Sequence, residues 1–409
     1  METVILSNGL RLLCIHNDRP TVYCGIMMGS GTRHELPSEC GMAHCVEHMS
    51  FKGTERRSAM QIINRMESVG GDINAFTTKQ ETVYYSICLK EHMSRALDLL
   101  MDIVFHSTYP EDALEREVEV IIDEIESYND SPSELIFDDF ENVLFKSHSL
   151  GRSILGDAES LRSFTSADLH RFTNRLYDPS RAVLFVMGDV KISDIIRCLK
   201  CDISEVNQFV NSRLSESSGQ VTKSIETSEY IVRDKQTHQA HVVVGCEAIT
   251  FNDDRFMGLF LLNNILGGVG MNSRLNVALR EKRGLVYTVE SSLLTYIDTG
   301  VWNVYMGCDV SDIKKCLGIV KKELQRLIDK PMSNSMLKSA VQQLKGQIAI
   351  SHDNFESVAI GTAKRLLYTG KVQTLEEMFA ELDALTPESL HQIATEFLNP
   401  DRMTTLIYK

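Results

Sequence analysis

The chain has 409 residues, more than one ordinary hydrophobic core holds, so we expect two domains. Apolar residues make up 43% of it and charged residues 24%, as in soluble globular proteins. The net charge of −14 argues against nucleic acid as a partner and is compatible with basic peptide substrates.

No segment carries a signal for export or membrane insertion. The start, Met1–Arg11, lacks a basic segment followed by a long apolar run, and no stretch reaches the roughly 18 apolar residues that span a bilayer. The ten cysteines are scattered, which suits free thiols in a reducing compartment. We therefore expect no membrane insertion and a cytoplasmic location in a bacterium. An organelle matrix stays open if a presequence was removed.

The first predicted helix, at about 41–51, carries the most informative motif of the chain, His44-Cys45-Val46-Glu47-His48. Residues four apart share a helix face, so His44 and His48 can reach one Zn²⁺ while Glu47 stands beside them. This is the inverted form, H-x-x-E-H, of a known zinc-binding pattern. A chance grouping on an exposed helix gives the same spacing, so the motif needs a third ligand.

A second helix is predicted over Glu111–Tyr128, because apolar residues recur there with helical periodicity. Glu117 and Glu124 are two turns apart and flank the apolar stripe, where a metal ligand should project. Spacing alone does not choose among the glutamates of this helix. We expect the others to be solvated, namely Glu111, Glu115, Glu119 and Glu126.

The two halves of the chain are repeats of one unit. The segment beginning at Asp168 resembles the segment beginning at Ser389, and each predicts a helix, an Asp/Asn-Pro turn and a strand. At a constant offset, the matched residues are Leu169, His170, Pro179 and Arg181 with Leu390, His391, Pro400 and Arg402. We predict a catalytic domain at 1–210, a Ser-rich linker at 211–228 and a homologous domain at 229–409.

Both halves follow one predicted order of elements, namely strand, helix, helix, strand, further helices and a closing strand. The strands are predicted at Val22–Met28 and Thr82–Leu89, then at His241–Cys246 and Thr299–Met306; the second half has a helix at about 255–266. The fold class is therefore α+β, a mixed sheet with helices packed on it in each domain. Aligning Met42 with Met257 puts Leu259, Leu262 and Asn263 at the motif positions, so the second domain cannot hold the metal.

Four segments resemble the inverted-motif zinc peptidases of the pitrilysin and insulinase family. They are Gly41–Thr54, Gly71–Thr77, Glu115–Glu124 and Leu150–Gly156. The resemblance spans essentially the whole chain and is strongest to the β-subunit of mitochondrial processing peptidase and its bacterial relatives. The chain departs from the family at Cys45, where a large apolar residue is favoured.

The resemblance implies one zinc ion per chain, held by His44, His48 and Glu124. Glu47 would take a proton from the attacking water and deliver it to the leaving amine. Glu117 matches an acidic residue that orients or electrostatically supports the ligands.

The second half also has a segment with an implied role. Arg280 and Tyr287 match an arginine and a tyrosine that reach the substrate, Arg280 at peptide carbonyls and Tyr287 at the developing oxyanion. The metal-free half would thereby close the chamber and complete the site. Without the resemblance, an arginine at a helix end and a core tyrosine are the expected interpretation.

The residues Asn74, Ala75, Phe76 and Thr77 match the family's substrate-binding edge strand. An extended peptide would add to it as a further strand through backbone hydrogen bonds. A core strand preceded by a turn is the alternative, and both can hold. Because this mode needs unfolded segments, folded proteins should resist cleavage.

Glu134 and Asp138 are four residues apart, so both carboxylates lie on one helix face. In the processing-peptidase branch the matching pair reads an arginine near the cleavage point, a geometry-specific contact. An acidic helix face without that role is the alternative.

The sequence therefore predicts a zinc metalloendopeptidase that cleaves extended or unfolded peptides, with a preference for arginine near the cleavage site. The alternative is a non-catalytic structural subunit resembling the core proteins of the bc1 complex. The sequence does not distinguish an enzyme that processes one peptide from one that degrades short peptides in general. Long family members enclose the substrate with four such domains, so this two-domain chain should dimerise. A homodimer is the simpler arrangement, and pairing with a motif-less relative stays open.

Overall fold

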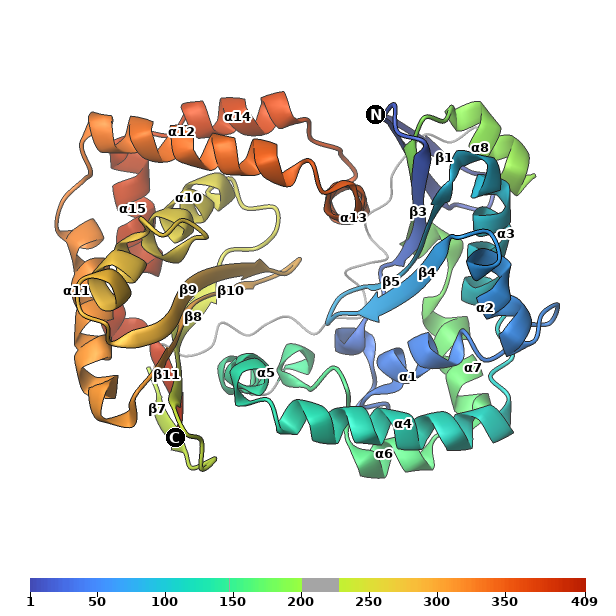
Figure 1. Ribbon diagram of the computed structural model, residues 1–409, viewed down its shortest axis with the longest axis horizontal. Helices are drawn as coiled ribbons and strands as arrows, with labels where there is room; N and C mark the ends of the chain where they lie inside the picture. The colour runs from blue at the N-terminus through green and yellow to red at the C-terminus, as the bar shows by residue number, and fades with distance from the viewer. Residues whose placement is uncertain (147, 201–227) are drawn as a thin grey trace. The chain divides into compact units, whose positions relative to one another are not determined.

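The computed structural model describes residues 1–146, 148–200 and 228–409, which divide by their internal contacts into two units (Figure 1). The first unit comprises Met1–Glu126, His352–Gln373 and the described part of Arg152–Ser218. The second comprises Ser127–Gly151, Thr374–Lys409 and the described part of Gly219–Ser351. Across the described ranges no helix has the length and apolarity needed to cross a bilayer. Apart from residue 228, the predicted linker lies outside the described residues.

The first unit is built on a six-stranded mixed sheet. Its strand order is β1 (Glu2–Ile5), β2 (Arg11–His16), β6 (Ala182–Gly188), β3 (Thr21–Met28), β5 (Thr82–Leu89), β4 (Asp72–Thr77). The β2–β6 pair is parallel and the other pairs are antiparallel. Among the described residues β4 pairs with β5 alone, so it is an edge strand, as the family resemblance implied.

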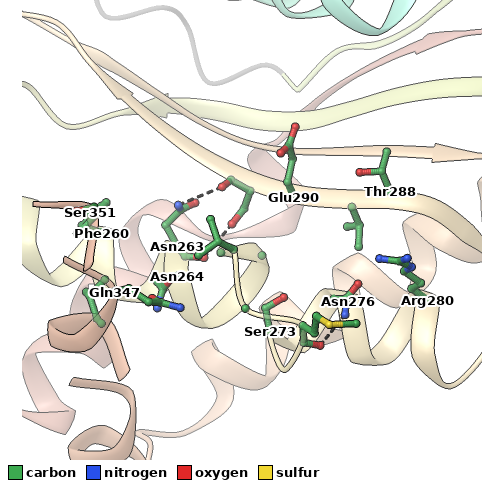
Figure 2. A pocket seen from close by; sticks show the side chains of 18 of the residues that line it. Phe260, Asn263, Asn264, Ser273, Asn276, Arg280, Thr288, Glu290, Gln347 and Ser351 are labelled. Carbon is green, nitrogen blue, oxygen red and sulfur yellow. Dashed lines mark hydrogen bonds between the residues drawn. The ribbon is translucent and has the colours of Figure 1, made fainter. Parts of the chain in front are cut away.

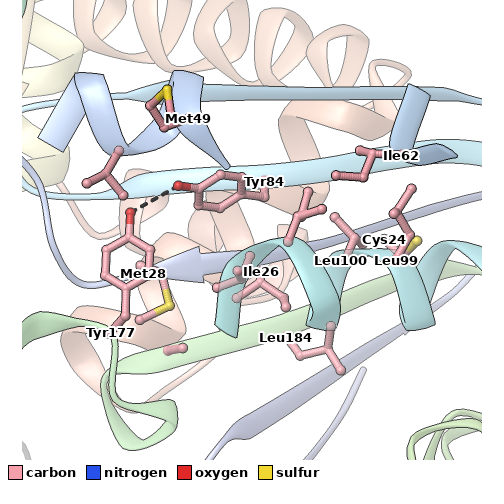
Figure 3. Close-up of a cluster of buried hydrophobic side chains, with 14 of the residues drawn as sticks. Cys24, Ile26, Met28, Met49, Ile62, Tyr84, Leu99, Leu100, Tyr177 and Leu184 are labelled. Atoms are coloured by element: carbon pink, nitrogen blue, oxygen red, sulfur yellow. Dashed lines mark hydrogen bonds between the residues drawn. The ribbon is translucent and has the colours of Figure 1, made fainter. Parts of the chain in front are cut away.

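Helices cover both faces of this sheet. On one face, Cys24, Ile26 and Met28 point into a core that includes Leu99 and Leu100, since residues two apart share a face (Figure 3). The helices of this unit are α1 (Met42–Met49), α2 (Ala59–Glu67), α3 (Met93–Phe105), most of α4 (Glu111–Asn129), α6 (Ala158–Ser163), α7 (Ser166–Leu176), α8 (Ile192–Leu199) and α13 (Phe355–Thr369). On the other face, α13 packs against β3 and β6. Burial of both faces explains why the central strand β6 is apolar and buried along its whole length.

The described part of the second unit repeats this plan with five strands. Their order is β7 (Tyr230–Arg233), β11 (Thr404–Tyr408), β8 (Ala240–Ala248), β10 (Gly300–Cys308), β9 (Val286–Thr295). Only the β7–β11 pair is parallel among the described strands of this sheet, as β2–β6 is in the first. Its helices are α5 (Pro132–Leu144), α10 (Phe256–Gly267), α11 (Ile313–Asp329), α12 (Asn334–Ser351), α14 (Leu375–Asp383) and α15 (Pro387–Phe397). The predicted α+β class with two homologous domains is confirmed.

The sequence repeat corresponds to equivalent helices and turns. The bounds of α7 and α15 keep the offset of the repeat, and each helix leads through a short turn into the closing strand. His170 Nε2 lies 3.3 Å from the Thr108 carbonyl oxygen, and His391 Nε2 lies 2.7 Å from that of Ile328. The repeated histidine therefore links the helix to a backbone carbonyl in both units.

Each half of the sequence contributes one helix to the other half's sheet. Helix α5, from the first half, packs on β8 and β11, with Ile136 and Phe140 in a core that contains Val243 and Leu406. Helix α13, from the second half, covers the equivalent strands β3 and β6. The packing units thus differ from the predicted boundaries at Ser127–Gly151 and His352–Gln373. The physical reason is that each sheet has a second apolar face, which a helix from the other repeat buries.

Candidate metal centre

The motif helix α1 is short and almost wholly buried, and its start is fixed by two features. Gly41 has a φ of 87°, which glycine adopts without strain, and a Cβ there would lie 2.8 Å from the Leu155 carbonyl oxygen. The Glu35 carboxylate accepts hydrogen bonds from the amides of Gly41 and Ala43, at 3.2 and 2.9 Å. These bonds satisfy amides at the start of the helix, which otherwise lack partners. Burial raises the pKa of Glu35 to about 8.

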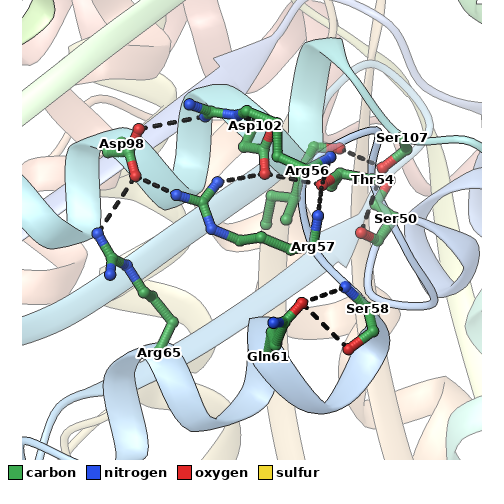
Figure 4. A network of polar contacts seen from close by, with 11 residues as sticks. Ser50, Thr54, Arg56, Arg57, Ser58, Gln61, Arg65, Asp98, Asp102 and Ser107 are labelled. Carbon is green, nitrogen blue, oxygen red and sulfur yellow. Dashed lines mark hydrogen bonds and ion pairs between the residues drawn. The ribbon is translucent and has the colours of Figure 1, made fainter.

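The segment that follows α1 is held on α3 by arginines and aspartates (Figure 4). Arg57 forms ion pairs with Asp98 and Asp102, and Arg56 Nε donates to Asp102 Oδ1 at 3.0 Å. Arg65 adds a contact of 3.3 Å to Asp98. Asp102 is fully buried, yet its hydrogen bonds hold its pKa below the ordinary range against the effect of burial. This network holds the chain beyond the motif in one place.

Two histidines and one glutamate converge at α1. His44 and His48 lie on one face of the helix, with ring centroids 4.5 Å apart. Glu124 Oε2, from α4, lies 3.8 Å from His44 Nε2 and 3.6 Å from His48 Nε2. Within the described residues, this is the only group of three or more His, Cys, Asp or Glu side chains whose ligand atoms all lie within 4.8 Å of one another. The structure thus distinguishes Glu124 from the other glutamates of α4.

Glu117 contacts the Nδ1 nitrogen of His48 and so positions its ring. Its Oε1 lies 3.0 Å from His48 Nδ1, and its Oε2 lies 2.5 Å from Lys52 Nζ. Burial raises the pKa of Glu117, but the hydrogen bonds from His48 and Lys52 outweigh burial and hold it below the usual range. A carboxylate on one ring nitrogen fixes the imidazole so that the other nitrogen is presented to a metal.

The donor set fits zinc. Two imidazoles and a carboxylate are the three protein ligands of many catalytic zinc sites. Burial, together with the nearby His48, lowers the pKa of His44 to about 3, so its imidazole is neutral, as metal binding requires. His44 Nδ1 is buried and has no hydrogen-bond partner among the described residues. This nitrogen is therefore not bound to another described protein group, and Nε2 is the nitrogen that faces Glu124.

Glu47 lies beside this group and is linked to the edge of the sheet. Its side chain is buried, which raises its pKa, and Thr77 Oγ1 donates to Glu47 Oε2 at 2.6 Å. Thr77 is the last residue of β4, the strand that contains Asn74, Ala75 and Phe76. The predicted substrate strand and the predicted base are thus in direct contact.

Arg280 and Tyr287 both belong to the second unit. Arg280 is exposed at the end of a helical turn, Asn276–Glu281, and lines a cavity of about 440 Å³ (Figure 2). Tyr287 is the second residue of β9, is 64% exposed and donates to Asp309 Oδ1 at 3.1 Å. The alternative of a core tyrosine is therefore wrong.

Glu134 and Asp138 lie on α5 and so belong to the second unit, not to the first as the predicted boundaries implied. Glu134 is exposed and Asp138 is half-buried, while Ile136 and Phe140 face the core. Their proposed contact with a substrate arginine stays a prediction.

Comparison with known proteins identifies the family. The model described as "Insulinase (Peptidase family M16)" matches residues 11–158, and that described as "Peptidase M16 inactive domain" matches 163–344. The chain belongs to this family of zinc peptidases, as its motifs predicted.

Its relatives cover almost the whole chain. It is similar to the uncharacterized zinc protease YmxG of Bacillus subtilis, at 34% identity over 98% of this chain and 96% of that one. It is also similar to the mitochondrial-processing peptidase subunit beta of Bos taurus, at 29% identity over 96% of this chain and 81% of the other. The crystal structure of a Helicobacter pylori protease has the same fold, with a TM-score of 0.87, 21% identity and coverage of 100% and 99%.

Three contributors were not predicted from the sequence. Lys52 lies four residues after His48, and this spacing could have indicated a position close to the motif. Thr77 was assigned to the substrate strand, with no indication of its bond to Glu47. Glu35 precedes the helix by several residues, and no local pattern connects it to the helix start.

Proposed function

We propose that the chain is a zinc-dependent endopeptidase in which His44, His48 and Glu124 hold the metal. The observation that carries this proposal is the convergence of one ligand atom from each within 4.8 Å, with Glu47 alongside. Membership of a zinc-peptidase family supports it.

In this proposal the residues of the first unit divide the chemistry among them. Zinc, when bound, supplies a Lewis acid that activates water and polarises a carbonyl group. Glu47 accepts a proton from the attacking water at its carboxylate and returns it to the leaving amine. Thr77 holds one oxygen of that carboxylate, and Glu117 holds the His48 ring. The raised pKa of Glu47 suits a group that both takes and gives a proton.

The substrate is proposed to be an extended peptide that adds to the free edge of β4. Asn74, Ala75, Phe76 and Thr77 would supply backbone hydrogen bonds, which tolerate many sequences. Arg280 and Tyr287 would bind peptide carbonyls and the developing oxyanion, and their exposure suits that role.

We further propose that the chain prefers arginine near the cleavage site, and that the carboxylates of Glu134 and Asp138 bind its guanidinium group. Changing both to amides, Glu134→Gln with Asp138→Asn, should weaken cleavage of arginine-containing peptides specifically. An equal loss on all peptides would refute the pocket.

One chain carries both the zinc motif and the Arg280 and Tyr287 pair, so we also propose a homodimer. Light scattering on the purified chain measures its mass in solution. A monomer that is fully active would contradict this part of the proposal.

The main test is the variant Glu47→Gln, assayed for zinc content and for cleavage of a peptide library. We expect one zinc per chain in both proteins and turnover in the unchanged chain alone, because glutamine cannot take the proton. Near-normal peptidase activity in the variant would sink the assignment of Glu47. A chain that binds zinc but cleaves nothing would instead favour the structural-subunit alternative.

A further inference from the structure

The second unit contains a cavity of about 680 Å³ with an excess of positive charge. It lies beside α11 and the turn that follows Asn276–Glu281. Its cationic lining residues are Arg274, Lys282, Arg283, Lys322, Arg326 and Lys330. Two carboxylates, Glu323 and Asp329, face them. A local surplus of cations is unexpected in a chain whose net charge is −14.

The two carboxylates are already engaged. Glu323 is buried and forms an ion pair with Arg326, one turn further along α11. Asp329 Oδ1 accepts a hydrogen bond of 2.9 Å from Gln325. They leave most of the positive charge around the cavity uncompensated.

The remaining cations have few partners. Arg283 Nη1 donates to the Ala278 carbonyl oxygen at 2.7 Å. Within the described ranges, Lys282, Lys322 and Lys330 take part in no ion pair. An anion in the cavity would lower the repulsion among these like charges.

Arg274 is the most informative of these groups. It is half-buried, and among the described residues its guanidinium makes no hydrogen bond. Burial lowers its pKa; the nearby Glu323 opposes this shift, and Arg326 adds to it. A guanidinium taken partly out of water without an acceptor is a costly arrangement that an anionic ligand would relieve.

We propose that this cavity binds a small polyanion with two or more phosphate groups. The volume lies in the range of small-molecule pockets, and several independent cations suit a ligand with several charged oxygens. Lysines act as point charges toward phosphate, while Arg274 offers a planar set of donors. The cavity belongs to the second unit and the zinc ligands to the first, so this proposal does not rest on the proposed peptidase activity.

The test uses inorganic pyrophosphate as the probe and the full chain, with binding followed by calorimetry and by thermal unfolding. Binding should raise the unfolding temperature, and added salt should weaken it. Lys322→Met should reduce the affinity about fivefold and Arg274→Gln about tenfold. Lys314→Met is the matched control, because Lys314 is an exposed lysine of the same helix that does not line the cavity.

The comparison between variants separates the cavity from other effects. Pyrophosphate also chelates zinc, but that contribution is the same in Lys322→Met and Lys314→Met. Equal affinity in these two variants would overturn the proposal, as would the absence of binding at millimolar pyrophosphate. Binding of a tetraglutamate peptide in preference to pyrophosphate would overturn the assignment to phosphate and indicate an acidic peptide instead.

Discussion

Glu47 and Thr77 are joined by a hydrogen bond of 2.6 Å between Glu47 Oε2 and Thr77 Oγ1. Glu47 belongs to the motif helix, whereas Thr77 ends the edge strand that we propose adds the substrate. Thr82 Oγ1 lies 3.4 Å from Thr77 Oγ1 and donates a hydrogen bond to the Ser30 carbonyl oxygen. Thr77 is therefore itself positioned by a hydroxyl group that is bonded to the backbone. The strand that would carry the peptide therefore also orients the proposed base.

Thr77→Val keeps the shape of the side chain but removes its hydroxyl group. We expect kcat to fall about tenfold, because the Glu47 carboxylate loses the donor that orients it. Zinc content and KM should stay close to their original values, and Thr77→Ser should restore the rate. Steady-state kinetics on a fluorogenic peptide measure both parameters. If valine and serine behave alike, or only KM changes, Thr77 serves substrate binding alone.

Glu117→Gln removes the charge that supports His48. Zinc affinity should fall by about 10-fold to 100-fold, as is usual when a carboxylate behind a ligating histidine is lost. Competition with a chelator of known affinity measures the change. Glu119→Gln is the control, because Glu119 lies on the same helix and, among the described residues, makes only an exposed ion pair with Arg162. Similar losses in both variants would point to the helix and not to the contact with His48.

Glu35→Gln tests how the start of α1 responds to pH. Burial raises the folded-state pKa of Glu35 to about 8 from 4.5, so its contribution to stability is complete below about pH 4.5 and declines as the pH rises toward 8. Relative to the variant, the free energy of unfolding of the unchanged chain should therefore fall over this range, by at most about 1.4 kcal/mol per pH unit. Above about pH 8 the difference in the free energy of unfolding should no longer change with pH.

Urea unfolding at several pH values measures this difference for Glu35→Gln. Glu91→Gln serves as the control, since the Glu91 side chain is 73% exposed. Parallel curves for the unchanged chain and Glu35→Gln would show that the carboxyl does not titrate across the range.

Cutting the chain at the predicted linker should leave each half without the helix that covers one face of its sheet. Residues 1–210 lack α13, which packs on β3 and β6 of the first sheet. Two of its side chains, Tyr368 and Lys364, also donate to Glu81 in the turn between β4 and β5, at 2.6 and 2.5 Å. We expect this fragment alone to aggregate or to unfold without cooperativity, because an apolar sheet face is exposed. Fusing 352–373 to it should restore a cooperative transition by circular dichroism. Cooperative unfolding of 1–210 by itself would refute this expectation.

Local pattern predicted much of the fold. The strand Thr82–Leu89 has the predicted bounds. The sequence repeat correctly predicted two related sheets. The motif helix and the helix of Glu124 were also placed correctly. These elements have periodic apolar faces or unusual polar spacing, and both are visible in one dimension.

The remainder depends on contacts that periodicity does not report. The apolar stripe of α5 shows that a face is buried, but not that Ile136 and Phe140 pack on the sheet of the other repeat. The bond between Thr77 and Glu47 joins residues that are 30 apart in the chain, and neither has a local signal for the other. The cations around the second-unit cavity come from separate segments whose proximity only the fold creates.

The exchange of α5 and α13 has a consequence for heredity. Each repeat relies on a helix that the other repeat encodes. A deletion that removes either half of the gene therefore removes part of the surviving half's structure as well. The second repeat, although it carries no zinc motif, is thus needed for the first to fold, apart from any part it has in binding the substrate.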